Sequence, residues 1–189
     1  MSFFDETKNF GLTVIAAGLM MVLSAILWLT DGLTVPPVGV LIGGLLLAVF
    51  GLGAYQGETM LNIGSLFDEG VTSKFGLVVG FVILIGIVEF LQGIFSMHPE
   101  SIVIGVVFVL FGTLMKLKIS PVLNNVIWAV LLIAFLAGII LEFYALFKVL
   151  DGEALEVLFS VLKTVAYLIM YIMLFTFMLS PEVKKRMSL

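Results

Sequence analysis

The sequence contains no cysteine and a single histidine, His98. One chain therefore supplies no thiol nucleophile, no cysteine-ligated zinc or iron–sulfur cluster and no paired-histidine haem ligation. Charged residues make up only 12% of the chain, about half their share in an ordinary soluble domain. With nine Lys and Arg and a net charge of −4, the chain is also not a basic nucleic-acid-binding protein. These absences predict a protein that is not an enzyme and holds no cofactor or metal.

Apolar residues are what the sequence has in excess. They form 62% of its 189 residues, and the mean hydropathy is +1.28. A transmembrane helix needs about 20 mostly apolar residues, and six stretches meet or approach that length: 10–29, 35–54, 75–95, 101–115, 122–147 and 155–179. Because no loop is long enough for a soluble domain, residues 1–189 are predicted to form one all-α integral domain in the lipid bilayer.

Proline and capping residues mark where several of these helices should begin. Pro36, Pro99 and Pro121 fall at expected helix starts, where the missing N–H of proline costs nothing. Ser120 and Asp151 are expected to be N-caps.

The basic residues predict how the chain is oriented. Loops rich in Lys and Arg stay in the cytoplasm. With six crossings, one side receives only Lys148 and the other receives seven basic residues: Lys8, Lys74, Lys116, Lys118, Lys184, Lys185 and Arg186. Both termini are therefore expected to be cytoplasmic, in the inner or plasma membrane. The outer rim is predicted to be acidic.

Three short similarities suggest that the chain is a tandem repeat of helical hairpins. Segment 8–14 resembles segment 74–79, the glycine spacing of 44–51 recurs in 105–112, and segment 87–90 is echoed by 140–143. Repeats of this kind would be parallel and related by a pseudo-threefold axis along the membrane normal, unlike the inverted repeats of many transporters.

Small residues allow membrane helices to approach each other closely. We expect helix packing at nine glycines: Gly39, Gly43, Gly44, Gly51, Gly86, Gly93, Gly105, Gly112 and Gly138. None of them belongs to a phosphate-binding pattern.

Three ionisable residues lie inside the predicted spans, where charge is costly and marks candidate functional sites. They are Glu89, Glu142 and Lys163. Counting along the helices places all three at a similar depth in the outer half of the membrane. Each is flanked at helical spacing by small residues, as Glu89 is by Gly86 and Gly93, so the charges are expected to point toward neighbouring helices.

Two interpretations of this Glu89–Lys163–Glu142 cluster remain open. In the first, the carboxylates bind a proton or small cation with help from three hydrogen-bonding residues: Gln92, Tyr144 and Tyr167. In the second, Lys163 bridges two helices as a polar clamp, or the glutamates extend to the outer interface.

Two further features carry weaker predictions. His98 is either a pH sensor in an outer turn or an ordinary turn residue. The connection 55–74 is either a short helix lying in the inner interface or a plain loop.

The arrangement of spans and glycines resembles the HdeD-type acid-resistance membrane proteins. The resemblance rests on six spans in three hairpins, Gly18 in the first span, Pro36 and Pro37 before the second, and the run from Gly44 to Gly51 within it. It implies a stress-associated integral membrane protein without a catalytic signature.

The leading hypothesis is therefore a non-enzymatic stress protein that acts by helix packing, self-association or contact with other membrane proteins. The first alternative is a small proton or cation channel or carrier that uses the Glu/Lys cluster. The second is a structural subunit of a larger membrane complex.

Overall fold

The computed structural model describes residues 7–31, 35–57, 73–117, 120–150 and 154–187. Within these ranges every regular element is a helix: α1 (Thr7–Asp31), α2 (Pro36–Gln56), α3 (Lys74–Ser96), α4 (Pro99–Leu117), α5 (Pro121–Val149), α6 (Ala154–Met178) and α7 (Pro181–Met187). The first six are long and apolar enough to cross a membrane, which confirms the six predicted spans. The fourth has 19 residues, longer than its apolar run alone indicates.

The predicted helix starts are confirmed where the structure describes them. Helices α2, α4 and α5 begin at Pro36, Pro99 and Pro121. Ser120 caps α5, because its hydroxyl accepts a hydrogen bond of 3.2 Å from the N–H of Leu123. The predicted cap at Asp151 and the interior of the 55–74 connection lie outside the described residues.

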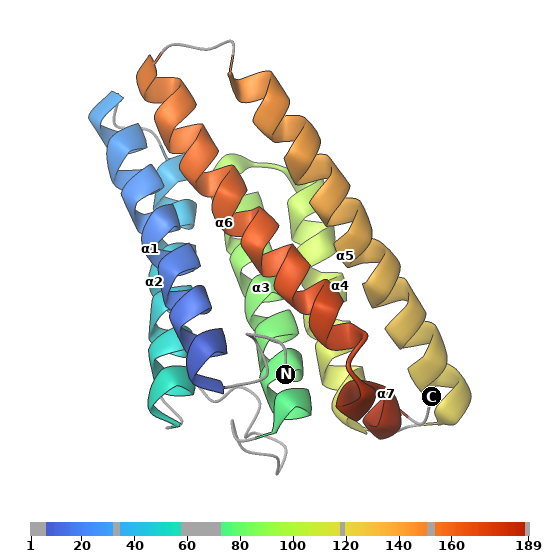
Figure 1. Ribbon diagram of the computed structural model, residues 1–189. Helices are drawn as coiled ribbons and strands as arrows, with labels where there is room; N and C mark the ends of the chain where they lie inside the picture. Colours follow the sequence, from blue (N-terminus) through green and yellow to red (C-terminus); the bar gives the residue numbers. More distant parts are fainter. Residues whose placement is uncertain (1–6, 32–34, 58–72, 118–119, 151–153, 188–189) are drawn as a thin grey trace.

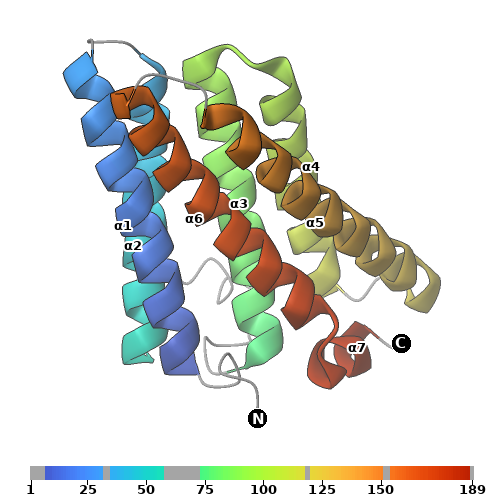
Figure 2. The same cartoon turned by 45° about the horizontal axis from the view of Figure 1, so that its top comes forward.

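Consecutive helices pack as antiparallel pairs, α1 with α2, α3 with α4 and α5 with α6. Between the pairs, α2 packs on α3, and α6 runs diagonally across α3 between α1 and α5 (Figures 1 and 2). Helix α3 is the most buried of the six spans, and α5 is the least buried. The hairpin order is thus observed, whereas the internal repeat and its pseudo-threefold axis stay predictions.

An aromatic cluster joins four helices near the end of the bundle where α1 begins and α6 ends. The ring of Phe10 in α1 lies 6.3 Å from Phe50 in α2, 5.4 Å from Phe81 in α3 and 5.3 Å from Phe177 in α6, measured between centroids. Phe50 and Phe81 stack on each other at 6.0 Å. Aromatic pairs of this geometry add about 0.5–1.5 kcal/mol each beyond the area they bury.

Glycines bring the paired helices into backbone contact. A Cβ atom at Gly18 would lie 2.6 Å from the carbonyl oxygen of Gly44, and one at Gly51 would lie 2.8 Å from that of Gly11. Between α3 and α4, a Cβ at Gly105 would lie 2.6 Å from the carbonyl oxygen of Gly86. Only a residue without a side chain permits this separation. All nine glycines singled out by their spacing lie against a neighbouring helix.

The beginning of α1 and the short helix α7 lie at the same end of the bundle (Figure 1). An even number of crossings produces this arrangement. Trp128, in the first third of α5, is hydrogen-bonded to the end of α6. Its Nε1 donates a hydrogen bond of 2.7 Å to the carbonyl of Met178. The ammonium of Lys184 in α7 lies 5.8 Å from the centre of the Trp128 ring. Which side of the membrane this end faces stays a prediction.

Met97 ends α3 in a left-handed conformation, with φ 55° and a side chain 87% exposed. Left-handed backbone costs a residue with a Cβ about 1–2 kcal/mol, whereas glycine adopts it freely. We therefore expect Met97→Gly to raise the melting temperature of the detergent-purified protein by about 2–8 °C. Met97→Ala is the control, since it removes the side chain but keeps the strained backbone. Equal melting of both variants would contradict the prediction.

Candidate functional site

The site is built around Glu89, the carboxylate on the central helix α3. Tyr171 of α6 donates a hydrogen bond of 3.2 Å from its Oη to Glu89 Oε1. Tyr171 is buried, and Glu89 is half-buried. The hydrogen bond joins two helices at the point where α6 crosses α3, so the charge points toward protein, as its flanking glycines indicate.

Packing holds the tyrosines of α6 in place. Tyr167 and Tyr171 are one helical turn apart, and their rings stack with centroids 6.0 Å apart. Phe135 of α5 lies 6.4 Å from the Tyr171 ring. Gly138 of α5 leaves room for the same ring, because a Cβ there would lie 3.0 Å from it. Tyr171 is therefore fixed from two sides with its hydroxyl aimed at α3.

Two buried polar atoms beside Glu89 lack hydrogen-bond partners among the described residues. They are Oη of Tyr167, a residue only 3% exposed, and Nε2 of Gln92 on α3. Tyr167 is close enough to the Glu89 carboxylate and to Gln92 to act on them electrostatically, without the geometry of a hydrogen bond. Buried polar atoms are nearly always satisfied in proteins, and an exception points to a ligand, a water or a catalytic role.

Glu142 and Lys163 interact with Glu89 at longer range. Glu142 of α5 is half-buried and interacts electrostatically with both Lys163 and Glu89. Lys163 of α6 acts on both carboxylates. Lys163, however, forms no ion pair within 4 Å with either Glu89 or Glu142, all three of which the structure describes. The direct bridge that a polar clamp needs is thus missing.

The structure brings together most, but not all, of the residues predicted to form the cluster. Glu89, Gln92 and Tyr167 lie side by side, with Glu142 and Lys163 in electrostatic range. Tyr144 does not join them. It lies on another face of α5, 58% exposed, with the ammonium of Lys148 4.8 Å from the centre of its ring.

Tyr171 is the site residue that the sequence prediction omitted. It lies four residues after Tyr167 and eight after Lys163, so all three lie along one side of α6. This spacing is the signal in the sequence that could have placed Tyr171 beside the other site residues of α6.

The composition of the site limits its chemistry. No group of three or more His, Cys, Asp or Glu that could hold a metal ion occurs among the described residues. A carboxylate has about four acceptor positions, and the Tyr171 hydroxyl uses one of them. Glu89 therefore retains acceptor capacity for a proton or a small monovalent cation.

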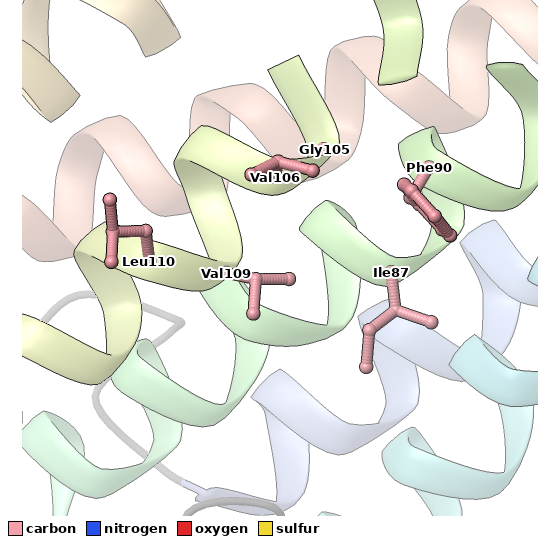
Figure 3. A pocket seen from close by; sticks show the side chains of 6 residues that line it. All are labelled: Ile87, Phe90, Gly105, Val106, Val109 and Leu110. Carbon is pink, nitrogen blue, oxygen red and sulfur yellow. The ribbon is translucent and has the colours of Figure 1, made fainter. Parts of the chain in front are cut away.

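Two other features lie apart from this cluster. His98 Nδ1 lies 3.3 Å from Glu100 Oε1 at the exposed turn between α3 and α4. An apolar groove of about 390 Å³ lies between α3 and α4, and Figure 3 shows that the side chains lining it carry only carbon atoms: Ile87, Phe90, Val106, Val109 and Leu110, with Gly105. Neither feature contributes a polar group to the Glu89 site.

Six helices, each long and apolar enough to span a membrane, define a multi-pass α-helical membrane protein. No family model, no curated protein and no solved structure matches the chain. The residues of the Glu89 site are therefore the basis for a functional proposal.

Proposed function

We propose that the protein is a small membrane carrier or channel that binds a proton at Glu89 during transport. The observation that carries the proposal is the 3.2 Å hydrogen bond from Tyr171 to Glu89, beside two buried polar atoms without partners. Ionisable residues inside membrane spans are rare and commonly form proton relays. Tyrosine hydroxyls both donate and accept, so Tyr167 and Tyr171 are suited to pass a proton to and from the carboxylate.

A proton fits this site better than a larger or more highly charged ion does. Multivalent cations are bound by several oxygen ligands, and the described residues contain no such carboxylate group. The net charge of the cluster also supports a monovalent ligand, because Lys163 offsets one of the two glutamates. A small monovalent cation is the alternative ligand of the same site.

Proton flux into proteoliposomes tests the proposal. With an imposed pH gradient and a pH-sensitive dye inside the vesicles, we expect Glu89→Gln to reduce flux about 100-fold or to the background leak. Glutamine preserves the shape of the side chain but does not exchange a proton at this position. The matched control is Glu100→Gln, the same change at an exposed turn, which should leave flux unchanged. Absence of flux in the unmodified protein, or equal flux in Glu89→Gln, would refute the proposal.

The second candidate is the non-enzymatic stress protein that acts by association in the membrane, in line with the HdeD-type resemblance. The exposed surface of α5 favours it. This helix presents large apolar side chains along one broad face, among them Ile133, Leu141 and Phe147. They face either lipid or other membrane proteins. The native mass in mild detergent distinguishes a monomer from a self-associated form or a subunit of a larger complex.

Both candidates share the proposal that the termini are cytoplasmic. Because the chain has no cysteine, single cysteines can be introduced and labelled with a membrane-impermeant thiol reagent. In intact cells we expect Lys185→Cys, on α7, to be protected and Glu100→Cys, at the opposite end of the bundle, to react. Both should react after the membrane is permeabilised. The reverse pattern in intact cells would invert the orientation.

A further inference from the structure

A second polar site lies between α1 and α6. It is a pocket of about 370 Å³ near the end of α1 and the start of α6, lined by Trp28, Glu156, Phe159, Ser160 and Lys163. Its lining includes an ammonium group, a carboxylate, a hydroxyl and two aromatic rings. In contrast, the groove between α3 and α4 is lined by hydrocarbon alone.

The wall of the pocket is held by direct contacts between the two helices. Ser24 of α1 donates a buried hydrogen bond of 2.6 Å to the backbone carbonyl of Phe159. One turn further along α1, the ring of Trp28 stacks on that of Phe159 at 5.3 Å, with an angle of 4° between the ring planes. Glu156, Phe159 and Lys163 are spaced by three and four residues, which places them on one face of α6.

The polar groups of the pocket have no close partners. Among the described residues, Glu156, Ser160 and Lys163 form no side-chain hydrogen bond and no ion pair within 4 Å. Lys163 reaches Glu89 and Glu142 only through longer-range electrostatics. A half-buried ammonium in an apolar bundle is stabilised by an anion close to it.

The positions of the two charges favour a ligand with charges of both signs. Seven residues separate Glu156 from Lys163, which is about 10 Å along the helix axis. Side chains of an α-helix lean toward its N-terminus, so the long side chain of Lys163 extends toward the level of Glu156. The side chain of Glu156 leans in the same direction, so the two charges stay apart along the pocket, and their sum is zero. A neutral zwitterion matches both, whereas an anion leaves Glu156 unmatched.

We propose that this pocket binds the headgroup of a zwitterionic phospholipid that carries a primary amine, because a primary ammonium can donate hydrogen bonds to the Glu156 carboxylate and a quaternary one cannot. The phosphate is placed at Lys163 and Ser160, and the ammonium at Glu156. The pocket lies at an end of the bundle, where the polar headgroups of the bilayer are found, and tryptophan is typical of that level. The pocket shares Lys163 with the Glu89 cluster, but the proposal does not require proton binding at Glu89.

Native mass spectrometry of the full chain in detergent tests the proposal. The protein is titrated with phosphatidylethanolamine, phosphatidylcholine or phosphatidylglycerol of the same acyl chains. We expect one phosphatidylethanolamine to be retained in preference to the other two lipids. Lys163→Met should weaken its binding at least about tenfold, which corresponds to the loss of one charge-assisted contact. Glu156→Gln should remove the preference over phosphatidylglycerol.

Matched controls separate this site from general lipid contact. Lys148→Met makes the same change on an exposed part of α5 and should leave lipid retention unchanged. Glu89→Gln should also retain the lipid, so the two proposals can fail separately. Equal retention of phosphatidylethanolamine and phosphatidylglycerol by the unmodified protein, or unchanged binding by Lys163→Met, would overturn the proposal.

Thermal stabilisation provides a readout that does not depend on equal stability of the variants. A ligand that binds only the folded state raises the melting temperature as its concentration increases. We expect phosphatidylethanolamine to raise the melting temperature of the unmodified protein and to have little effect on Lys163→Met. Free phosphoethanolamine should not reproduce the rise, because it lacks the acyl chains. If it does reproduce the rise, the pocket takes a soluble zwitterion and the lipid proposal is wrong.

Discussion

Replacing Gly44 by alanine is expected to lower the melting temperature of the detergent-purified protein by about 2–12 °C. A Cβ at this position would lie 2.7 Å from the carbonyl oxygen of Gly18 and 2.9 Å from the N–H nitrogen of Val22. Both atoms belong to the backbone of α1, so no side-chain rotation relieves the overlap. Overpacking of this kind costs about 1–3 kcal/mol, because the two helices must move apart along their whole contact.

Gly39→Ala on the same helix is the matched control. A Cβ there would lie 3.2 Å from the Cα of Gln92 and from the Cβ of Phe95 on α3, so α3 needs to move by only a few tenths of an ångström. Alanine also has the higher helix propensity, by about 1 kcal/mol in a soluble helix, so Gly39→Ala is expected to melt close to the unmodified protein. Equal melting of Gly44→Ala and Gly39→Ala would contradict the close approach of α1 and α2.

A double substitution tests whether Gly18 and Gly44 act as one contact. Each glycine faces the backbone of the other, with a Cβ at Gly18 placed 2.6 Å from the Gly44 carbonyl oxygen. Once one alanine has separated the helices, the second meets less resistance. The loss of stability in Gly18→Ala/Gly44→Ala should therefore be smaller than the sum of the two single losses. Strict additivity would indicate that the two residues are not in contact.

The spans could be predicted from the sequence because a run of about 20 apolar residues is a signal contained in the run itself. The helix starts at Pro36, Pro99 and Pro121 are equally local, since proline fixes its own backbone. The inward orientation of Glu89 also followed from its neighbours on the same helix, Gly86 and Gly93. Each of these inferences needs only the residues of one helix.

The partners of the charged residues could not be predicted in the same way, because they depend on which helices meet. The hydrogen bond from Tyr171 exists because α6 crosses α3, and no spacing within α6 indicates that crossing. Lys163 was assigned to the carboxylates, yet its side chain also lines a pocket against Trp28 of α1. Its position on α6 is compatible with both groups of neighbours, and only the three-dimensional arrangement shows that Lys163 lines the pocket while it stays in electrostatic range of the carboxylates.

Replacing Glu89 by methionine and Tyr171 by phenylalanine together is expected to stabilise the protein by about 1–4 kcal/mol while abolishing proton flux. The two substitutions remove a half-buried carboxylate and its buried hydrogen-bond donor and leave apolar side chains of similar size. Exchanging buried polar or ionic groups for well-packed apolar ones is often neutral or stabilising by this amount. A gain in stability with a loss of function is typical of a group retained for its activity.

The single variants should behave differently from the double one. Tyr171→Phe leaves the Glu89 carboxylate without its donor, and Glu89→Met leaves the buried Tyr171 hydroxyl without its acceptor. A buried polar group that loses its partner costs about 1–3 kcal/mol, and more when it is charged. Each single variant is therefore expected to be less stable than the double variant. Thermal unfolding of all four proteins in one detergent gives the coupling between the two residues.

Glu182→Met is the control for the change of side chain alone. Glu182 is exposed on α7, so its replacement should change stability by less than about 0.5 kcal/mol. A double variant at the Glu89–Tyr171 pair that is clearly less stable than the unmodified protein would mean that the pair holds α3 and α6 together. The structural interpretation of the cluster would then be favoured. A stable double variant that still conducts protons would instead move the transport site away from Glu89.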